Sequence, residues 1–327
     1  MKLRAGIDLG GTKLAVGVVD DEGKILGECA TYDHLGLKEE QVLDRVVRNL
    51  ASALDDAGRA LGRTLGFKDL SGVGILFPGH LRWPDGVTLT SSNLPGFKGF
   101  PLRQRLEERL SVPVLADNDA NGQTLGEHRY GAGKGADHMV FMTVSTGVGG
   151  GIIIDGRLYR GMTGTAGEFG HMIVDATGGG TCACGNRGCL MGSVSGLALP
   201  QVAHLAARRL MAAGKKVNLP SGCIDLDELD GELLGAGCKD DNELCLQVVD
   251  DFAHHIGIGL YNVFQILNPQ RVVLGGGLLN LPDVFFETAT KTCYELAGAM
   301  MLERMDIRRG SLGVRAGILG AAALFQP

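Results

Sequence analysis

A short strand–turn–strand pattern occurs twice in the sequence, and this repetition constrains the fold more than any other feature. Residues 3–9 are apolar, Gly10 and Gly11 form a turn, and residues 14–19 are apolar again, before a third strand over 23–31. Residues 138–159 repeat this order, with the glycine turn at 145–151. Apolar runs of this length bounded by glycines are typical of buried strands. A true duplication predicts two similar α/β lobes facing each other across a cleft. The pattern is short, so by itself it leaves a chance similarity open.

The segments between and after the two copies predict helices and further strands. Apolar residues between Val42 and Leu54 recur at the spacing of one helical face, which predicts a helix over residues 39–61. The other predicted helices cover residues 102–110, 119–130, 242–267, 281–300 and 313–325. The other predicted strands cover residues 69–77, 112–116, 152–155, 156–159 and 271–277. No low-complexity linker occurs, so structured segments must join the lobes.

Composition excludes several classes of partner. The chain of 327 residues is long enough for two domains, each with its own core. The net charge of −6 gives no basic surface for nucleic acid, so small-molecule partners are expected. The first residues have no apolar signal segment, and the apolar runs are too short and too glycine-broken to span a bilayer. We therefore expect a cytoplasmic protein with reduced thiols and no membrane partner.

One histidine and three cysteines have the spacing of a metal site. They follow the pattern H-x10-C-x-C-x4-C and comprise His171, Cys182, Cys184 and Cys189. One imidazole and three thiolates complete a tetrahedron around zinc and leave no open position for water, which indicates a structural ion. Gly185 and Gly188 allow the tight turns that such a knuckle needs. The alternative is a set of scattered core cysteines, as the other five cysteines are expected to be.

Three glycine turns each end a predicted buried strand, at Gly10–Gly11, at residues 147–151 and at residues 275–277. Glycine lets backbone N–H groups approach phosphate oxygens closely, although each turn alone is also compatible with an ordinary tight turn. The P-loop pattern G-x4-G-K-[ST] is absent, and no G-x-G-x-x-G follows the first strand. Three separate turns therefore suggest an ATP site between two domains.

The first turn also carries groups suited to a magnesium–phosphate complex. Asp8 at a strand end can hold Mg²⁺ through water, Thr12 can donate a hydroxyl, and Lys13 can supply positive charge. The alternatives are a turn-capping aspartate at Asp8 and a solvated surface lysine at Lys13.

Five motifs in this order resemble the ROK family of sugar kinases and sugar-responsive repressors. They begin at Asp8 (DLGGTK), Asn118 (NDAN), Thr146 (TGVGGG), Glu168 (EFGH) and Cys182 (the cysteine run), and the resemblance covers nearly the whole chain. It implies the two-lobed, actin-like ATPase fold of the hexokinase and ribonuclease H type, with lobes that close around ATP and a sugar. It also implies a homodimer. On this fold we expect a small lobe over residues 1–117, with the helix at about 313–327 packed back on it, and a large lobe over 118–312 with the zinc knuckle.

The resemblance assigns roles to single residues. Asp119 matches the catalytic base and Asn118 a ligand of a sugar hydroxyl; a carboxylate there can accept the hydroxyl proton as the oxygen attacks the γ-phosphoryl group. Asp117 is expected to be a neighbour, and the alternative for both aspartates is an N-cap of the following helix. The other matching sugar-side residues are Gly79, Asn93, Glu168 and His171. The matching nucleotide-side residues are Asp8, Gly10, Gly11, Thr12, Lys13, Thr146, Gly147 and Gly276. One ring nitrogen of His171 would bind zinc while the other faces a sugar hydroxyl.

Position 191 departs from the family pattern. The sugar kinases place a glutamate there that binds a sugar hydroxyl, whereas this chain has Met191. A thioether is a poor acceptor, and the loss of such a bond, about 1.5–3 kcal/mol, would weaken hexose binding tenfold to a hundredfold. Neutral drift with compensation elsewhere is the alternative. Relatives also tend to continue Pro-Val where this chain has His80, Arg82 and Trp83, which we expect at the surface, with ligand stacking of Trp83 as the alternative.

These observations favour an ATP-dependent kinase of a hexose or hexose-like sugar, with glucose as the default substrate. Met191 keeps other substrates open, namely fructose, mannose, allose, N-acetylmannosamine or another polyol. A repressor would carry a DNA-binding helix-turn-helix ahead of the first motif, and only seven residues precede Asp8. A sugar-binding protein without catalysis is a third possibility, against which Asp119 argues.

Overall fold

The computed structural model describes residues 2–298 and 304–325, and it shows an α/β protein, as the sequence predicts. Its packing divides the chain into two units. The first unit comprises residues 1–137, 151–166 and 310–327, and the second comprises 138–150 and 167–309. The sequence analysis assigned residues 118–137, 151–166 and 310–312 to the large lobe, whereas they pack with the first unit.

The first unit is built on a five-stranded sheet of order β3-β2-β1-β4-β7. Its strands are β1 (Leu3–Leu9), β2 (Leu14–Val19), β3 (Ile25–Thr31), β4 (Leu70–Phe77) and β7 (Val114–Asn118). The first three strands form an antiparallel meander, with Ile7 opposite Val16, while β1, β4 and β7 run parallel, with Ile7 opposite Ile75. The carboxyl ends of β1, β4 and β7 therefore lie at one edge of the sheet.

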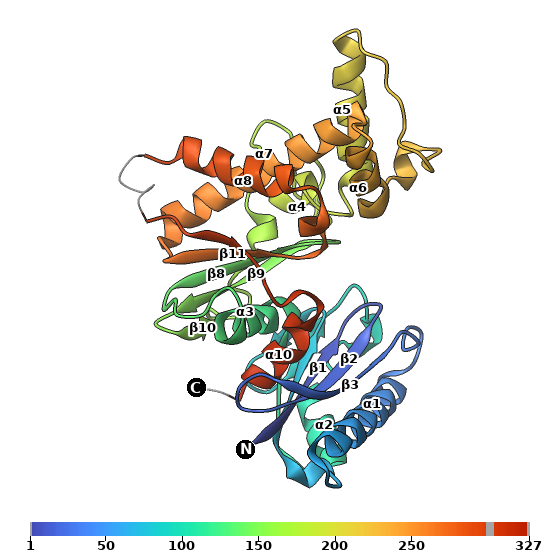
Figure 1. The fold of residues 1–327 in the computed structure, drawn as a ribbon, viewed down its shortest axis with the longest axis vertical. Coiled ribbons are helices and arrows are strands. Elements are labelled where there is room, and N and C mark those ends of the chain that lie inside the picture. Colours follow the sequence, from blue (N-terminus) through green and yellow to red (C-terminus); the bar gives the residue numbers. More distant parts are fainter. Residues whose placement is uncertain (1, 299–303, 326–327) are drawn as a thin grey trace. The chain divides into compact units, whose positions relative to one another are not determined.

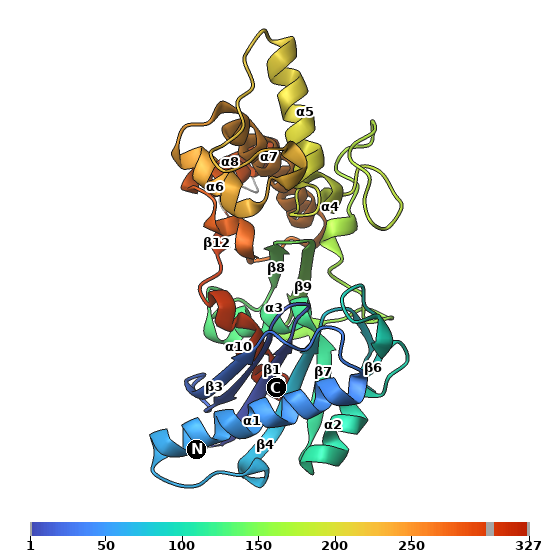
Figure 2. The ribbon, with the colours of Figure 1, turned by 90° about the vertical axis from the view of Figure 1, so that its right-hand side faces the viewer.

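Alternate residues of a strand point to opposite faces of the sheet, and in β1 and β2 the residues of both faces are mostly buried. Helices therefore cover both faces of this sheet. Ile7 and its neighbours at every second position pack in one core with α1 (Glu39–Leu61) and α2 (Leu102–Leu110) (Figure 2). The opposite face packs on α10 (Ala316–Ala323), which lies beside α3 (Asp119–Tyr130) (Figure 1). At Gly6 and Gly74 an added Cβ would lie 1.9 and 1.8 Å from carbonyl oxygens of α10. Glycine at these two positions therefore allows α10 to lie directly on the sheet.

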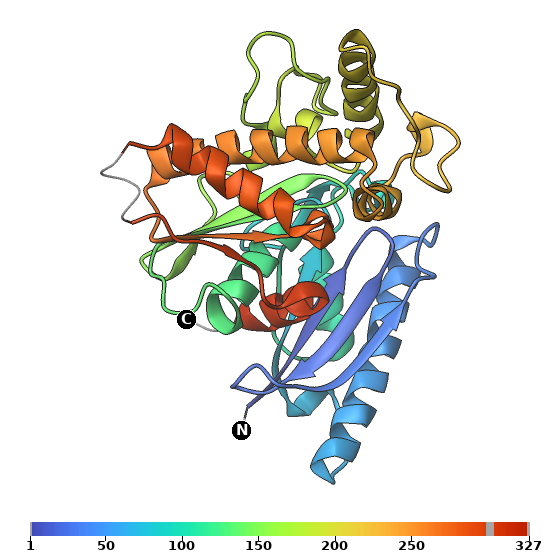
Figure 3. The same cartoon turned by 45° about the horizontal axis from the view of Figure 1, so that its top comes forward.

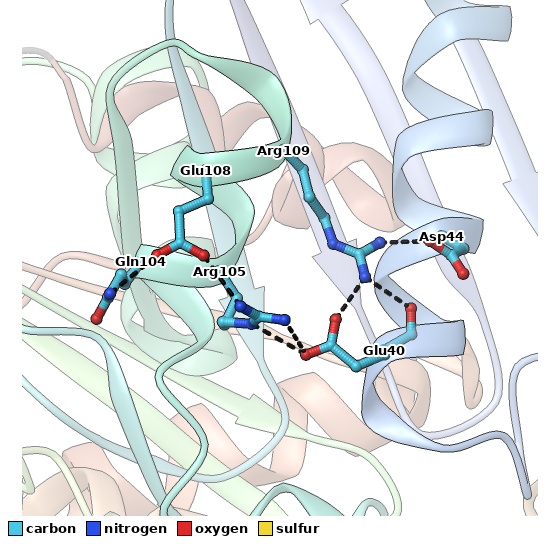
Figure 4. A network of polar contacts seen from close by, with 6 residues as sticks. All are labelled: Glu40, Asp44, Gln104, Arg105, Glu108 and Arg109. Carbon is cyan, nitrogen blue, oxygen red and sulfur yellow. Dashed lines mark hydrogen bonds and ion pairs between the residues drawn. The ribbon is translucent and has the colours of Figure 1, made fainter.

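An ion-pair network fixes α2 against α1 (Figure 4). Arg105 Nη2 lies 2.7 Å from Glu40 Oε1, and Arg109 binds both Glu40 and Asp44. Hydrogen bonds from Arg105 lower the pKa of the Glu40 carboxyl. Because the network is exposed, we expect it to orient α2 more than to stabilise the unit.

The second sheet has the order β10-β9-β8-β11-β12. Its strands are β8 (Met139–Val144), β9 (Val148–Ile154), β10 (Arg157–Tyr159), β11 (Arg271–Gly275) and β12 (Ile307–Arg309). Strands β8, β11 and β12 run parallel. The helices of the second unit are α4 (Leu190–Ser193), α5 (Leu199–Ala212), α6 (Gly231–Lys239), α7 (Glu243–Leu267) and α8 (Asp283–Leu296), of which α7 and α8 pack side by side (Figure 3). Asn242 caps α7 by accepting a hydrogen bond from the backbone of Cys245.

The two sheets have the same strand order, a meander followed by two parallel strands, so the duplication predicted from the sequence is confirmed. The short remaining elements are β5 (His80–Arg82), β6 (Val87–Thr90), η1 (Phe67–Asp69), η2 (Pro95–Phe97), η3 (Phe169–His171), η4 (Leu226–Glu228), η5 (Gly277–Asn280) and η6 (Gly313–Arg315). In residues 2–298 and 304–325 no helix combines the length and the apolar character needed to cross a bilayer.

Several predicted boundaries are wrong in detail. Residues 148–151, predicted as part of a turn, belong to β9; Gly150 is needed there because an added Cβ would lie 2.4 Å from the Phe141 carbonyl oxygen. The helix predicted over residues 281–300 is α8, which ends at Leu296, and residues 299 and 300 lie outside the described residues. The helix predicted over 313–325 is divided into η6 and α10, and the two last residues of the helix expected at about 313–327 are also outside the description. Helices α5 and α6 were not predicted.

Candidate functional site

The turn between β1 and β2 is fixed by a hydrogen bond to a buried histidine. Gly10 N–H donates to the Lys13 carbonyl oxygen at 2.9 Å, and His34 Nε2 lies 2.9 Å from the Gly10 carbonyl oxygen. His34 is fully buried. Because a peptide group is planar, fixing this carbonyl also fixes the N–H of Gly11. The sequence analysis missed His34, because a lone histidine gives no signal of its contacts.

Asp8 lies near the carboxyl end of β1 and is crowded by protein on one side. An added Cβ at Gly317, in α10, would lie 2.0 Å from Asp8 Oδ2. The pKa of Asp8 is raised to about 6, chiefly by burial and also by repulsion from Asp119, while the charge of Lys13 partly offsets the rise. A buried carboxylate that is repelled by a neighbouring carboxylate suits a divalent cation with oxygen ligands, so Asp8 fits the expected Mg²⁺.

The run from Asp117 to Asp119 joins β7 to α3, and Asn118 is the N-cap. Its Oδ1 accepts a hydrogen bond from Ala120 N at 2.9 Å. Its Nδ2 donates to the Gly79 carbonyl oxygen at 3.1 Å and to Asp119 Oδ1 at 2.9 Å. The amide therefore orients the Asp119 carboxylate at the first turn of α3.

Asp117 differs from Asp119 in its surroundings. It is 5% exposed, and its Oδ1 accepts hydrogen bonds from Asn118 N at 2.8 Å and Asn121 Nδ2 at 3.0 Å. Its Oδ2 accepts from Arg160 Nε at 2.8 Å. Both carboxylate oxygens of Asp117 are therefore engaged in hydrogen bonds within the first unit. The sequence analysis missed Arg160, because no motif includes it.

Asn93 lies against the first glycine turn. An added Cβ at Gly11 would lie 2.7 Å from Asn93 Nδ2. Gly79, whose carbonyl holds Asn118, also needs to be glycine, because an added Cβ would lie 2.1 Å from the Thr90 carbonyl oxygen. The first unit therefore brings four of the predicted sugar-side positions, Gly79, Asn93, Asn118 and Asp119, to the same edge of the sheet as Asp8.

The corresponding edge of the second sheet carries the turn after β8. Ser145 N–H donates to the Gly147 carbonyl oxygen at 2.8 Å, and the backbone N–H of Leu197 donates to the Thr146 carbonyl oxygen at 3.2 Å. Gly276 follows β11 with φ of 95°, where an added Cβ would lie 2.2 Å from the Val144 carbonyl oxygen. The carboxyl ends of parallel strands are where ligands bind in open α/β sheets.

Met191 lies against this second turn. It belongs to α4 and is half-buried, and its Sδ is 3.3 Å from the position of a Cβ added at Gly147. The residue that departs from the family pattern is therefore in contact with a predicted nucleotide-side glycine.

The predicted zinc ligands come together. Their ligand atoms all lie within 4.8 Å of one another. Cys184 Sγ and Cys189 Sγ are 3.8 Å apart, and Cys182 Sγ is 3.6 Å from His171 Nδ1. A tetrahedral zinc with Zn–S bonds of about 2.3 Å places two sulfurs about 3.8 Å apart, whereas a disulfide needs about 2.05 Å. The four residues therefore fit a closed zinc site.

His171 presents its other nitrogen to Glu168. Nδ1 faces the thiols, while Nε2 lies 3.9 Å from Glu168 Oε2, beyond hydrogen-bond distance. Both side chains are about two-fifths exposed. The Nε2 side of His171, where Glu168 lies, is therefore the side on which the predicted contact with a sugar hydroxyl would form.

The three residues after Gly79 that depart from the family pattern lie in and after β5. His80 Nδ1 is 3.2 Å from Thr90 Oγ1, and Arg82 forms a surface ion pair with Asp85. The guanidinium carbon of Arg160 lies 3.6 Å from the centre of the Trp83 ring. Trp83 therefore stacks on a cation of its own unit.

The chain is similar in sequence and in fold to known glucokinases. A glucokinase of Halalkalibacterium halodurans is 31% identical over 324 residues, which cover 98% of this chain and 94% of that protein. The crystal structure of a ROK family glucokinase from Streptomyces griseus in complex with glucose and AMPPNP is 31% identical, with a TM-score of 0.79 and 98% of both chains covered. The expected actin-like ATPase fold is therefore confirmed.

The same region also occurs in regulators. The xylose repressor of Caldicellulosiruptor bescii is 28% identical over 319 residues, which cover 98% of this chain and 77% of that protein. The model of the ROK family matches residues 4–327, almost the full length. The chain therefore belongs to the ROK family.

Proposed function

We propose that the protein is an ATP-dependent kinase of a hexose or a hexose-like sugar, with glucose as the first candidate. The observation that carries the proposal is the contrast within one run of three residues. Asp117 is occupied on both oxygens by Asn118, Asn121 and Arg160, whereas Asp119 is half-buried and oriented by Asn118 at the start of α3. The similarity to glucokinases supports the same reading.

In this proposal Asp119 accepts the proton of the sugar hydroxyl as its oxygen attacks the γ-phosphoryl group. The sugar hydroxyls are positioned by Asn118, Asn93 and Gly79, and further hydroxyls are bound by Glu168 and His171. Zinc takes no part in the reaction and acts only by fixing the ring of His171.

The glycine turns of the two sheets would bind the phosphates. Gly11, whose peptide is fixed by His34, and Gly147 present backbone to the nucleotide, with Lys13 adding positive charge. The remaining nucleotide-side residues are Asp8, Gly10, Thr12, Thr146 and Gly276. Magnesium, when bound near Asp8, would neutralise charge on the phosphates.

The identity of the sugar depends on Met191. In the family a glutamate at this position binds a sugar hydroxyl, and Met191 cannot make this hydrogen bond. A substrate that lacks this hydroxyl, or has an apolar group in its place, would therefore bind here no more weakly than glucose. Fructose, mannose, allose and N-acetylmannosamine are therefore the alternative substrates. The homodimer stays a prediction that light scattering of the purified protein tests.

A coupled assay of ATP consumption across glucose, fructose, mannose, allose, N-acetylmannosamine, N-acetylglucosamine and inositol tests the proposal. We expect turnover with at least one hexose and none without a sugar. If a sugar binds in calorimetry and no ATP is consumed with any of them, the protein is a sugar-binding protein and the kinase proposal fails.

A further inference from the structure

We propose that a cavity in the first unit binds a small amphipathic anion, meaning a carboxylate or phosphate monoester on an apolar body. We also propose that this binding changes the position of Asn118. The cavity measures about 370 Å³ and lies among α3, β10, the end of α10 and Trp83. Its volume falls in the range of small-molecule sites, about 300–1,000 Å³. It contains none of the residues assigned to the sugar or the nucleotide.

One wall of the cavity is apolar. It is formed by Leu115, Leu125, Leu158 and Leu324 from four different segments. Three of these leucines belong to a small core cluster on the α10 face of the sheet, so the wall is held by packing. A bound apolar group would cover partly exposed leucine side chains, which favours binding by the hydrophobic effect.

The charged lining of the cavity is entirely basic. Arg129, Arg157 and Arg160 line it, and the lining residues, all within the described part of the chain, include no aspartate or glutamate. The guanidinium of Arg157 is exposed and makes no hydrogen bond or ion pair with any described residue. A guanidinium beside an apolar wall suits a carboxylate or phosphate, which it can bind through two parallel hydrogen bonds. An inorganic anion would not use the wall, and a neutral apolar molecule would not use Arg157.

Arg160 connects the cavity to the candidate catalytic residues. On one side its guanidinium stacks on Trp83 at 3.6 Å, and on the other its Nε donates to Asp117 Oδ2 at 2.8 Å. Asp117 Oδ1 in turn holds the backbone N–H of Asn118 at 2.8 Å. An anion that attracts Arg160 weakens its bond to Asp117 and so alters the position of Asn118. This second step rests on the proposed function of Asn118 in sugar binding, whereas the binding step does not.

The sequence contains one tryptophan, Trp83, and it lines the cavity, so its fluorescence reports on occupancy directly. Cyclohexanecarboxylate is a suitable probe because it does not absorb where tryptophan does. We expect a saturable change of emission with this probe. Cyclohexylmethanol, which lacks the charge, and acetate, which lacks the apolar body, should bind at least about fivefold more weakly.

Two variants test the two halves of the cavity. Arg157→Ala removes the cation and Leu158→Phe fills space beside the wall, and each should weaken the probe at least about fivefold. Arg208→Ala, an exposed arginine of α5 outside the cavity, changes the net charge equally and should leave binding unchanged. The absence of a saturable change, or equal binding by wild type and both cavity variants, would overturn the site.

Calorimetry with glucose, with and without saturating cyclohexanecarboxylate, tests the connection to Asn118. We expect the affinity for glucose to change at least about threefold, and less in Arg160→Gln, where the link to Asp117 is weakened. Unchanged glucose affinity in the wild type would overturn the connection. The fluorescence titration needs neither sugar nor ATP. It therefore still tests binding of the anion in the cavity if the kinase proposal fails.

Discussion

The two sheets share one strand order but carry different chemistry at the same edge. Both present glycine turns at the carboxyl ends of parallel strands. The first sheet adds Asp8, Lys13 and Asp119, which are charged, while the turn of the second sheet offers Thr146 and Gly147 and is backed by Met191. The apolar pattern of the repeat therefore determines the topology, and the few residues after each strand determine what the edge can do.

The two units also differ in how they hold their functional loops. In the first unit the turns rest on a continuous core that joins the sheet to α1 and α2. In the second unit the segment between His171 and Cys189 forms no helix or strand (Figure 2), and its two end residues come together with Cys182 and Cys184 from within it. A metal bound by these four residues would replace the packing that this segment lacks.

The largest difference should appear between the two neighbouring aspartates. Asp119→Asn should lower kcat about 10²–10⁴-fold, because it removes the proton acceptor while keeping the size of the side chain. The affinity for the sugar, measured by calorimetry, should change only a few-fold. The matched variant Asp117→Asn loses the charge that pairs with Arg160, so it should unfold at a lower temperature and keep more turnover than Asp119→Asn. If Asp117→Asn is the more severe of the two in kcat, the assignment of the base is wrong.

The next largest effect concerns the metal of the second unit. Cys184 is exposed, so Cys184→Ser removes a ligand without opening a cavity. We expect bound zinc, measured by elemental analysis, to fall well below one per chain and the unfolding midpoint to fall by roughly 10 °C. Cys29→Ser, a cysteine of the first unit, should keep the zinc. Wild-type protein that is purified without zinc and unfolds at the same temperature after zinc is added would contradict the site.

These two contrasts also show what the sequence could and could not predict. The motifs gave the strand ends, the helix over residues 119–130 and the four zinc ligands, because each depends on spacing along the chain. The contacts of His34, Arg160 and Gly317 could not be predicted, because they join segments that are distant in sequence. Helices α5 and α6 were missed because nothing in the motifs required them. The turn after β8 was predicted too long, because glycines needed for close packing in β9 look the same as turn glycines.

Met191 lies in the second unit, at the position where the family resemblance predicts a glutamate. Met191→Glu should raise the affinity for glucose tenfold to a hundredfold, equivalent to about 1.5–3 kcal/mol, by restoring a charge-assisted hydrogen bond to a hydroxyl. Met191→Leu, which conserves volume, should leave glucose binding unchanged. Calorimetry with glucose and with an ATP analogue separates the outcomes. Because Met191 lies beside Gly147, a change in nucleotide affinity alone would assign the position to the nucleotide side instead.

Asp8 supplies the smallest effect, on the stability of the metal-free and nucleotide-free protein. Its pKa is raised from the ordinary aspartate value of 3.8 to about 6, so between these pH values the folded state binds more protons than the unfolded state. Stability should therefore decrease as the pH rises from about 4 to 6 and remain lowered above 6. Asp8→Asn removes this loss and should be more stable than the wild type by about 3 kcal/mol at neutral pH, with no difference below pH of about 4.

Urea unfolding of the wild type and Asp8→Asn across this pH range measures the effect of Asp8. The variant should also bind Mg²⁺–ATP more weakly, because the group that destabilises the free protein is the one proposed to face the cation. This opposition between stability and binding has no counterpart in the turn after β8, where Thr146→Val should alter nucleotide affinity without a pH-dependent change in stability. A gain in stability of Asp8→Asn that grows toward acid pH would mean that the carboxyl is ionised more easily in the folded state. In that case the edge of the first sheet would not carry a destabilised carboxylate at Asp8, and this difference from the edge of the second sheet would be absent.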